Sequence, residues 1–589
     1  MKEEQGKGIR EIAGSGYGFA VTGALIGAVI FVLLYGIATL IPTNVSFIYD
    51  SDDKDVVSHQ LGFDFYRSSS WQHPLGLTDA YPYPYESSVI NSDSIPLLAV
   101  PFKLVSPFLP VFFQYFGFWI FFCFVMQGGA AALLLRKLKM DYWAMAASVP
   151  LFIINVPLLF RCFHHSSLAA QWVILVCFIL FLEMHELGIK KQAAAWCLLC
   201  GLTVWIHGYL FIITGTLMTM LCVLKFIKEK KIKDVALIFV PCVIVTLFCY
   251  YEGGGFISYT SVEMHGLGLY TLDLTDFINP ASFSTFLTGM EGIVTSETAS
   301  YLGAGVVLLI VAAMAAVLKN REPAAGLIKE KRTEIVCILV FCLVFLVMSM
   351  SVCGKFLGIN IYDLRNILGE KILVFLSGFR ASARFIWPVW YLILTAAVYF
   401  ICMCAKHRKA VLVLLVLCSI IQYADIVPKT AKGGADQFVS GYRTRCDDAF
   451  ENVFTDQAEH LCFLGTSYNI EDIVFASKHG MTVNFSNVGR GPKNSVQKDT
   501  DEFNEGKLRN DTVYVTDVES LNYIYPVSLP DDYCIYLCGE YIYIFHGSLM
   551  QNWPGEDAVM VDVQNLAAAA GTIYETEGAP VPVPTYENR

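Results

Sequence analysis

Residues 50–76 read DSDDKDVVSHQLGFDFYRSSSWQHPLG and come soon after an apolar run over residues 17–42. A run of about 20 apolar residues is long enough to cross a membrane. The two stretches therefore predict a membrane helix that opens into a loop rich in reactive polar groups. That loop begins with a cluster of acidic residues: Asp50, Asp52, Asp53 and Asp55.

Asp55 and His59 are four positions apart, so on a helix they share one face. A carboxylate and an imidazole placed together can do acid–base chemistry or hold a metal ion. The alternative is a solvated loop whose charges only keep it out of the bilayer. We take Asp55 as the candidate general base, with Asp53 in reserve and His59 beside it.

The composition is that of an integral membrane protein. The chain has 589 residues, of which 55% are hydrophobic and only 16% are charged, whereas soluble proteins carry about 25% charged residues. The formal net charge is −11, and we expect no nucleic-acid partner. The first apolar run is long and lacks a small-residue cleavage site, so we expect a span and not a signal peptide.

Apolar runs elsewhere predict a polytopic α-helical protein with eleven spans in all. The run 192–224 is too long for one helix, and His207 with Gly208 is its natural break. Short or broken helices at membrane depth commonly border a cavity. The expected spans are residues 17–42, 110–135, 142–160, 168–187, 192–206, 208–224, 235–251, 301–318, 334–351, 384–404 and 409–424.

The distribution of Lys and Arg predicts the orientation. Basic residues are concentrated in residues 1–16 and in the short loops on that same side of the spans. Loops rich in Lys and Arg stay in the cytoplasm, so we expect a cytoplasmic N-terminus in a cell membrane. The polar loops 43–109, 252–300 and 352–383 then face outward, and segment 93–108 is read as helical pieces at the outer interface.

Beyond the membrane domain of residues 17–424, the sequence predicts an outward α/β domain over residues 425–566. HLCFLG, MTVNF and DTVYVTD are typical strands, and NIEDIVFASKHG is typical of a helix that ends at Gly480. YCIYLCGEYIYIFHG alternates around Gly539 and Glu540, which indicates a hairpin. Residues 567–589 are expected to form a flexible tail.

Arg380 and Arg384 lie four apart before an apolar run, so on a helix they would share one face at the outer boundary of the expected membrane. Arginine there runs against the positive-inside trend and needs a partner. A guanidinium pair suits a phosphate, although a structural pair with an acid of a neighbouring loop fits as well. Lys355 is a further candidate phosphate ligand. Four other residues are possible substrate contacts: His165, His207, Arg67 and Trp71.

Four blocks of the sequence resemble a bacterial multi-spanning family of unknown function, over roughly residues 17–430. The blocks are DKDVVSHQLGFDFYRSSSWQHPLG, SDSIPLLAVPFKLVSPFLPVFFQYFG, FHHSSLAAQW and GFRASARFIWPVWY. The order of loops and spans also resembles the GT-C superfamily of polyprenyl-phosphate-sugar-dependent glycosyltransferases. That resemblance implies an essential acid in the first outward loop, a role that falls to Asp55 here.

We therefore expect a GT-C-type glycosyltransferase that moves a sugar from a polyprenyl-phosphate carrier to an extracytoplasmic glycan or cell-wall acceptor. Membrane lipids are expected partners. One alternative is a lipid-linked glycan transporter or flippase, which would want polar groups midway through several spans. The other is a non-catalytic envelope scaffold or sensor, in which the aspartate cluster would tolerate substitution.

Two further expectations concern the site. Asp55, His59, Arg380 and Arg384 should line one outward cavity roofed by the domain after residue 425, because base and phosphate ligands must contact one substrate. We predict no metal cofactor, although the aspartates and His59 together could hold a divalent cation through their oxygens and imidazole.

Overall fold

The computed structural model describes most of the chain, and it divides into two compact units. The first unit comprises Met1–Pro42, Tyr115–Tyr250 and Val262–Phe438, and the second comprises Thr43–Gln114, Tyr251–Ser261 and Val439–Arg589. The described residues are 16–49, 51, 54–257, 266–290, 296–431, 442–466, 468–486, 495–517, 520, 524, 529–555 and 558–560.

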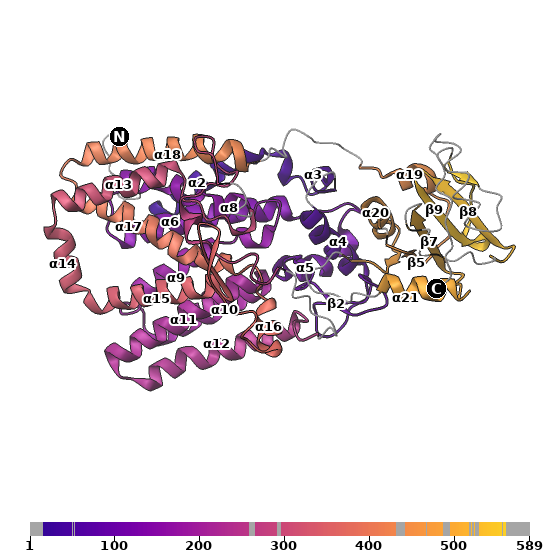
Figure 1. The fold of residues 1–589 in the computed structure, drawn as a ribbon, viewed down its shortest axis with the longest axis horizontal. Helices are drawn as coiled ribbons and strands as arrows, with labels where there is room; N and C mark the ends of the chain where they lie inside the picture. Colours follow the sequence, from indigo (N-terminus) through magenta and orange to yellow (C-terminus); the bar gives the residue numbers. More distant parts are fainter. Residues whose placement is uncertain are drawn as a thin grey trace, which may run out of the picture. The chain divides into compact units, whose positions relative to one another are not determined.

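The first unit is mostly helical (Figure 1). Its α-helices are α2 (Gly16–Tyr35), α6 (Phe116–Lys137), α7 (Tyr142–Ile153), α8 (Val156–Leu159), α9 (Trp172–Leu182), α10 (Ile189–Ile206), α11 (Gly208–Glu229), α12 (Ile232–Glu252), α13 (Ala304–Lys319), α14 (Glu322–Glu330), α15 (Arg332–Met350), α16 (Glu370–Ser377), α17 (Trp387–Cys404) and α18 (Arg408–Thr430).

Each of the eleven expected spans contains a helix, but the count of eleven membrane-crossing helices is not supported. In the part of the chain that the structure describes, seven helices are long and apolar enough to cross a membrane, or eight if α13 and α14 form one span bent by 91°. The seven are α2, α6, α11, α12, α15, α17 extended to Ser382, and α18.

The expected span over residues 142–160 shows why the count falls. Helix α7 ends at Ile153, and the Asn155 side chain accepts a hydrogen bond from the Leu158 backbone N–H at 2.9 Å. This is an N-cap, which starts the separate short helix α8. The apolar run is therefore long enough for a span, but the helix is not.

Helices α2 and α6 pack with their backbones in close approach. A Cβ added at Gly23 would lie 2.2 Å from the carbonyl oxygen of Gly128, and one at Gly27 would lie 2.1 Å from that of Phe124. Small residues of this kind let membrane helices approach closely and gain van der Waals contact. The predicted break between α10 and α11 is confirmed: His207 is extended and caps α11.

The connections of the first unit carry short elements that position the candidate site. The hairpin of β3 and β4 is antiparallel and follows α15. These elements are η1 (Ala38–Leu40), η3 (Ser166–Ala169), η4 (Leu274–Phe277), η5 (Ser296–Thr298), β3 (Cys353–Phe356), β4 (Ile359–Asp363) and η6 (Ser382–Ile386).

In the second unit, the first part of the chain forms helices around a short two-stranded sheet. These elements are α3 (Ser46–Tyr49), α4 (Lys54–Ser68), β1 (Leu77–Thr78), β2 (Ser87–Ser88), α5 (Pro96–Leu104) and η2 (Ser106–Phe108). The helical pieces expected within residues 93–108 are thus present as α5 and η2. Their place at a membrane interface stays a prediction.

The remainder of the second unit is an α/β fold with a six-stranded sheet of order β10-β8-β9-β7-β5-β6. Strand β5 is parallel to β6 and β7, whereas β9 pairs antiparallel with β7 and β8. The elements are α19 (Arg445–Phe450), β5 (His460–Phe463), α20 (Ile470–Lys478), β6 (Thr482–Val483), α21 (Ser495–Asn504), β7 (Thr512–Asp517), β8 (Tyr533–Cys538), β9 (Tyr541–His546), η8 (Gly547–Leu549) and β10 (Val559–Met560).

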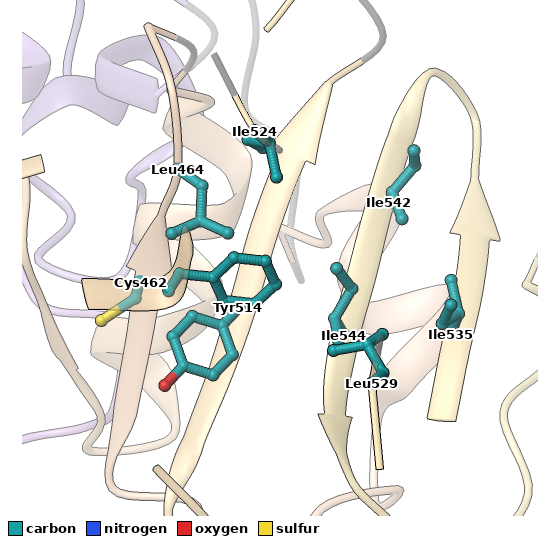
Figure 2. Close-up of a cluster of buried hydrophobic side chains, with 9 residues drawn as sticks. Cys462, Leu464, Tyr514, Ile524, Leu529, Ile535, Ile542 and Ile544 are labelled. Atoms are coloured by element: carbon teal, nitrogen blue, oxygen red, sulfur yellow. The ribbon is translucent and has the colours of Figure 1, made fainter. Parts of the chain in front are cut away.

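The strands, helix and hairpin expected in this region are therefore confirmed. Aliphatic residues from β8 and β9 pack with Leu464, Phe503 and Tyr514 in a buried core (Figure 2). Burial of such side chains stabilises the fold by about 1.5–3 kcal/mol each. The expected domain boundary at residue 425 falls inside α18, and residues 567–589 lie outside the described residues.

Candidate functional site

Four side chains of the first unit converge on the carboxylate of Glu297. Arg161 Nη1 lies 2.9 Å and Arg384 Nη2 lies 2.6 Å from Glu297 Oε2. His164 Nε2 is 3.0 Å and His165 Nε2 is 3.7 Å from Oε1. We call these five residues the arginine cluster.

Both arginines of the arginine cluster are buried, so their charges act strongly on the neighbouring groups. Arg161 is 2% exposed and Arg384 is 6% exposed. Burial works to raise the pKa of Glu297, but the charges of Arg161 and Arg384 outweigh it and hold that pKa far below its usual range. Burial and the charge of Arg384 lower the pKa of His165, which keeps its imidazole neutral. Two guanidinium cations thus share one carboxylate.

Aromatic rings support both guanidiniums. The Arg384 guanidinium carbon lies 4.9 Å from the centroid of the Tyr209 ring, and that of Arg161 lies 4.7 Å from the centroid of the Phe160 ring. The Ala381 backbone N–H donates to the Tyr209 hydroxyl at 2.9 Å, which ties the start of η6 to α11. Stacking on an aromatic face orients a guanidinium without neutralising it.

The expected pair of Arg380 and Arg384 is wrong as a shared helix face. Ser382–Ile386 forms the 3₁₀ helix η6, and Arg380 precedes it. A 3₁₀ helix has three residues per turn, so positions four apart do not align. Arg161, from the end of α8, stands beside Arg384 on Glu297 instead, and Arg380 is only partly buried.

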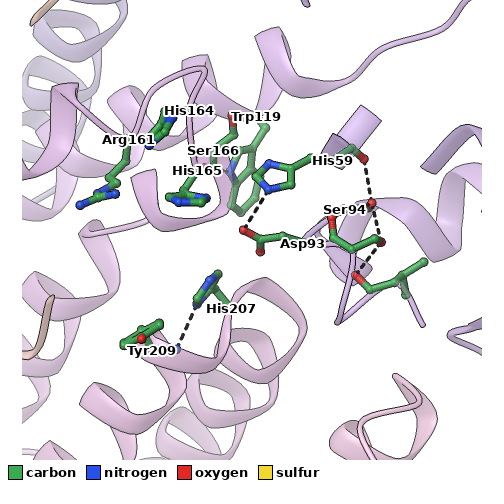
Figure 3. A network of polar contacts seen from close by, with 12 residues as sticks. His59, Asp93, Ser94, Trp119, Arg161, His164, His165, Ser166, His207 and Tyr209 are labelled. Atoms are coloured by element: carbon green, nitrogen blue, oxygen red, sulfur yellow. Dashed lines mark hydrogen bonds and ion pairs between the residues drawn. The ribbon is translucent and has the colours of Figure 1, made fainter. Parts of the chain in front are cut away.

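Two other candidate residues of the first unit are engaged by the backbone. Lys355 Nζ donates to the Leu269 carbonyl at 2.9 Å. The Tyr209 backbone N–H donates to His207 Nδ1 at 3.0 Å, so this imidazole serves as the cap of α11 (Figure 3). Both contacts are structural, and neither residue belongs to the arginine cluster.

In the second unit, α4 carries the predicted acid and imidazole. Asp55 lies in its first turn, and His59 is one turn further, so the shared face is confirmed. His59 Nε2 is 3.5 Å from Asp93 Oδ2, and Ser94 Oγ donates to the His59 carbonyl at 2.7 Å (Figure 3). His59 is 6% exposed, so a carboxylate holds a buried imidazole here. Asp53 lies outside the described residues.

The sequence interpretation missed Asp64 on the same helix. Its carboxyl accepts hydrogen bonds from the Tyr49 hydroxyl at 2.5 Å and from Gln60 Nε2 at 3.0 Å. Burial raises the pKa of Asp64 to about 6, because the hydrogen bonds from these neutral donors offset only part of the effect of burial. Gln60 lies one turn before Asp64 on α4, whereas Tyr49 belongs to the separate helix α3, and no sequence pattern indicates that contact.

The candidates Arg67 and Trp71 lie in the last turn of α4 and just beyond its end. Arg67 Nη2 donates to the Pro110 carbonyl at 2.8 Å, which fixes the segment before α6. Trp71 is half exposed, and its ring centroid lies 4.9 Å from Lys103 Nζ. Burial lowers the pKa of Lys103 to about 8. Arg67 is therefore engaged structurally, whereas Trp71 retains an exposed aromatic surface.

The described residues also bring ligand-type atoms of Glu459, His460 and Asp511 within 4.8 Å of one another in the second unit. His460 Nδ1 is bonded to Thr482 Oγ1 at 2.7 Å. Glu459 is exposed, and exposed acids are as readily hydrated as coordinated. The expectation of no metal cofactor stays a prediction.

The common cavity of Asp55, His59, Arg380 and Arg384 also stays a prediction, because the first two residues belong to the second unit and the last two to the first. Within the first unit, the chemical capacity is clear. A pair of buried guanidiniums with one carboxylate has a surplus positive charge and suits an anion such as a phosphate.

Family comparison covers most of the chain. Residues 24–427 match a domain of unknown function, DUF6311, and residues 450–545 match the DUF6311 C-terminal domain. No match was found among curated proteins. The arginine cluster and α4 both fall inside the first matched range.

Proposed function

The chain belongs to the DUF6311 family, and we propose that it is an integral membrane glycosyltransferase. It transfers a sugar from a polyprenyl-phosphate carrier to a cell-envelope acceptor, by the GT-C type of mechanism. The observation that carries the proposal is the arginine cluster, in which Arg161 and Arg384 share the single carboxylate of Glu297.

The cluster fits a lipid-borne phosphate for two reasons. Its net positive charge persists at neutral pH without any contribution from His165, because two guanidiniums face one carboxylate and Arg161 keeps a pKa of about 10 despite burial. Its arginines also lie at helix ends: Arg161 follows α8, and Arg384 lies in the first turn of the candidate span Ser382–Cys404. A phosphate on a membrane lipid is the anion available at the end of a span.

The chemistry assigns a role to each group. Asp55 takes the proton of the acceptor hydroxyl while the hydroxyl oxygen attacks the anomeric carbon of the sugar. The bond between that carbon and the phosphate oxygen breaks, and the polyprenyl phosphate leaves with both bonding electrons. Arg161 and Arg384 stabilise the charge that develops on this phosphate. His59, held by Asp93, orients the acidic end of α4.

In this proposal the protein lies in the cell membrane with a cytoplasmic N-terminus. The polar loops and the C-terminal α/β domain are extracytoplasmic, in line with the concentration of Lys and Arg in the opposite loops. The acceptor is accordingly a glycan or cell-wall component outside the cytoplasm.

The experiment uses the purified full chain in proteoliposomes with a panel of polyprenyl-phosphate-linked hexoses and N-acetylhexosamines. Released polyprenyl monophosphate is quantified by mass spectrometry, because this product is the same for every sugar and acceptor. Crude envelope glycan is supplied as acceptor. Arg384→Ala and Asp55→Asn should each reduce release by about 10²-fold or more.

Arg365→Ala is the matched control, because Arg365 is exposed and pairs locally with Asp363 at 2.6 Å. It should release product at the wild-type rate. The proposal is wrong if the wild type releases no polyprenyl phosphate from any donor, or if Arg384→Ala and Asp55→Asn both keep full activity. Movement of an uncleaved donor between leaflets would identify a transporter instead.

A further inference from the structure

The segment between α15 and η6 displays large apolar side chains on its surface. Ile359 is 72% exposed, Ile367 is 76% exposed and Phe375 is 70% exposed. Large exposed apolar side chains gathered in one segment indicate an interaction site. We call β3, β4 and α16, with their connections, the hairpin module; its exposed apolar residues are Phe356, Leu357, Ile359, Ile361, Ile367, Ile372, Val374 and Phe375.

The exposed residues are not an unfinished core, because the hairpin module already has one. Leu373 and Leu376 of α16 pack against a buried group that includes Val352 and Cys353. Ile372 and Phe375 of the same helix are exposed instead. Helix α16 is therefore apolar over more of its surface than the described residues cover.

The tip of the hairpin is held in place while it presents apolar side chains. The backbone N–H groups of Leu357 and Gly358 donate to the Asp273 carboxylate at 3.2 and 2.7 Å. Phe356 and Ile359 are paired across the strands next to this turn. A buried carboxylate thus fixes a turn whose outer surface is apolar, which is the opposite of an ordinary solvated hairpin.

Basic residues accompany the apolar surface. Lys355, Arg365, Lys371 and Arg380 belong to the module or its flanks, and their acidic neighbours are Asp363 and Glu370. Exposed apolar groups edged by Lys and Arg are the composition of segments that lie in the interface of an anionic bilayer. A soluble partner would not require this combination.

The chain connections place the module at the end of two candidate spans. Helix α15 ends at Met350, and β3 begins at Cys353. After α16 ends at Ser377, the next candidate span begins at Ser382. Both ends of the hairpin module are therefore tied to membrane helices within a few residues, and the lipid surface is the apolar phase within reach.

We propose that the hairpin module docks into the lipid interface at this end of α15 and α17. Phe356, Ile359, Ile361 and Phe375 lie among the acyl chains near the head groups, and Lys371 contacts anionic lipid phosphates. This membrane contact is independent of the sugar-transfer activity.

The experiment places a photoreactive benzoylphenylalanine at position 361 or 375 of the full chain. Each variant is reconstituted with phosphatidylglycerol and phosphatidylethanolamine, irradiated, and examined by mass spectrometry for lipid adducts. Trp553 is the exposure-matched control, because it is 74% exposed but lies in the second unit. Positions 361 and 375 should give at least about tenfold more lipid adduct than position 553.

A second measurement separates lipid from protein partners. If positions 361 and 375 give adducts with another copy of the chain and none with lipid, the surface is a protein interface and the proposal is overturned. Absence of lipid adducts at both positions, in a protein that keeps its thermal unfolding transition, overturns it as well. A fall in lipid adducts when neutral phosphatidylcholine replaces phosphatidylglycerol supports the role of Lys371.

Discussion

Two carboxyl groups, the partly buried Glu297 in the first unit and the buried Asp64 in the second, have pKa values shifted in opposite directions. Glu297 faces Arg161 and Arg384, and their charges hold its pKa far below the usual range even though burial opposes them. Asp64 is bonded by the neutral donors of Tyr49 and Gln60, and burial raises its pKa to about 6. Burial acts to raise the pKa at both sites, so the charge of the partners decides which protonation state persists.

This difference separates two kinds of chemistry. A carboxylate fixed between two guanidiniums cannot exchange protons near neutral pH, and it serves to hold the arginines in place. A buried carboxyl with neutral partners changes its charge within the physiological range. The Glu297 carboxylate of the arginine cluster therefore keeps its charge near neutral pH, whereas the Asp64 carboxyl on α4 can gain or lose a proton in that range.

The largest predicted effect tests the electrostatic side of this comparison. Glu297→Gln leaves Arg161 and Arg384 buried without their shared counter-charge, and loss of one member of such a group costs about 3–5 kcal/mol. The free energy of unfolding in detergent, measured by denaturant or by thermal transition, should fall accordingly. Excess inorganic pyrophosphate should restore part of the loss if the cluster binds anions.

Asp363→Asn provides the control, because Asp363 pairs with the exposed Arg365 in the same unit. An exposed ion pair contributes about 0–1 kcal/mol. If Glu297→Gln costs no more than Asp363→Asn, the arginine cluster does not depend on its carboxylate, and the contrast with Asp64 disappears.

The next prediction concerns the pH dependence of Asp64. Its pKa in the folded state, about 6, is raised from 3.8, so the unfolded state releases this proton first as pH rises. The stabilising contribution of the neutral carboxyl is complete below pH 3.8 and is lost as pH rises to 6. The shift corresponds to about 3 kcal/mol.

The measurement is the difference in unfolding free energy between the wild type and Asp64→Asn, taken at intervals from pH 4 to pH 7. Subtraction removes the contribution of other titrating groups. The unfolding free energy of the wild type should fall relative to that of Asp64→Asn as the pH rises across this range. A difference that stays constant with pH would show that Asp64 is ionised throughout, as Glu297 is.

The sequence predicted local elements well, because each has its own repeat. The β8–β9 hairpin follows from alternation around Gly539, whereas the sequence predicts a loop at α4 and indicates only that Asp55 and His59 would share a face if it were helical. The arginine cluster could be predicted only in part, since the sequence singles out Arg384 and His165 as candidates but not Glu297. Glu297 lies on a three-residue turn whose partners are more than 80 positions away.

The pairing of Arg380 with Arg384 failed for a different reason. A spacing of four aligns side chains only on an α-helix, and η6 is a 3₁₀ helix. Likewise, the composition of residues 142–160 predicts a span, but the cap at Asn155 divides it. Composition determines where apolar segments lie, whereas caps and turns determine where helices end.

The smallest predicted effect is that of Asp93→Asn, which tests whether the acid that pairs with His59 of α4 contributes less to stability than Glu297 does. Asp93 is half-buried, pairs with His59 at 3.5 Å and has a left-handed backbone with φ of 55°. Asparagine tolerates that conformation and keeps a carbonyl oxygen for the imidazole, so the variant should cost less than about 1 kcal/mol.

Asp93→Ala should cost about 1–2 kcal/mol more, because alanine is strained at this φ. Both are measured as unfolding free energies beside Glu297→Gln. A cost for Asp93→Asn equal to that of Glu297→Gln would mean that the His59 imidazole is permanently charged and depends on Asp93 as the arginines depend on Glu297.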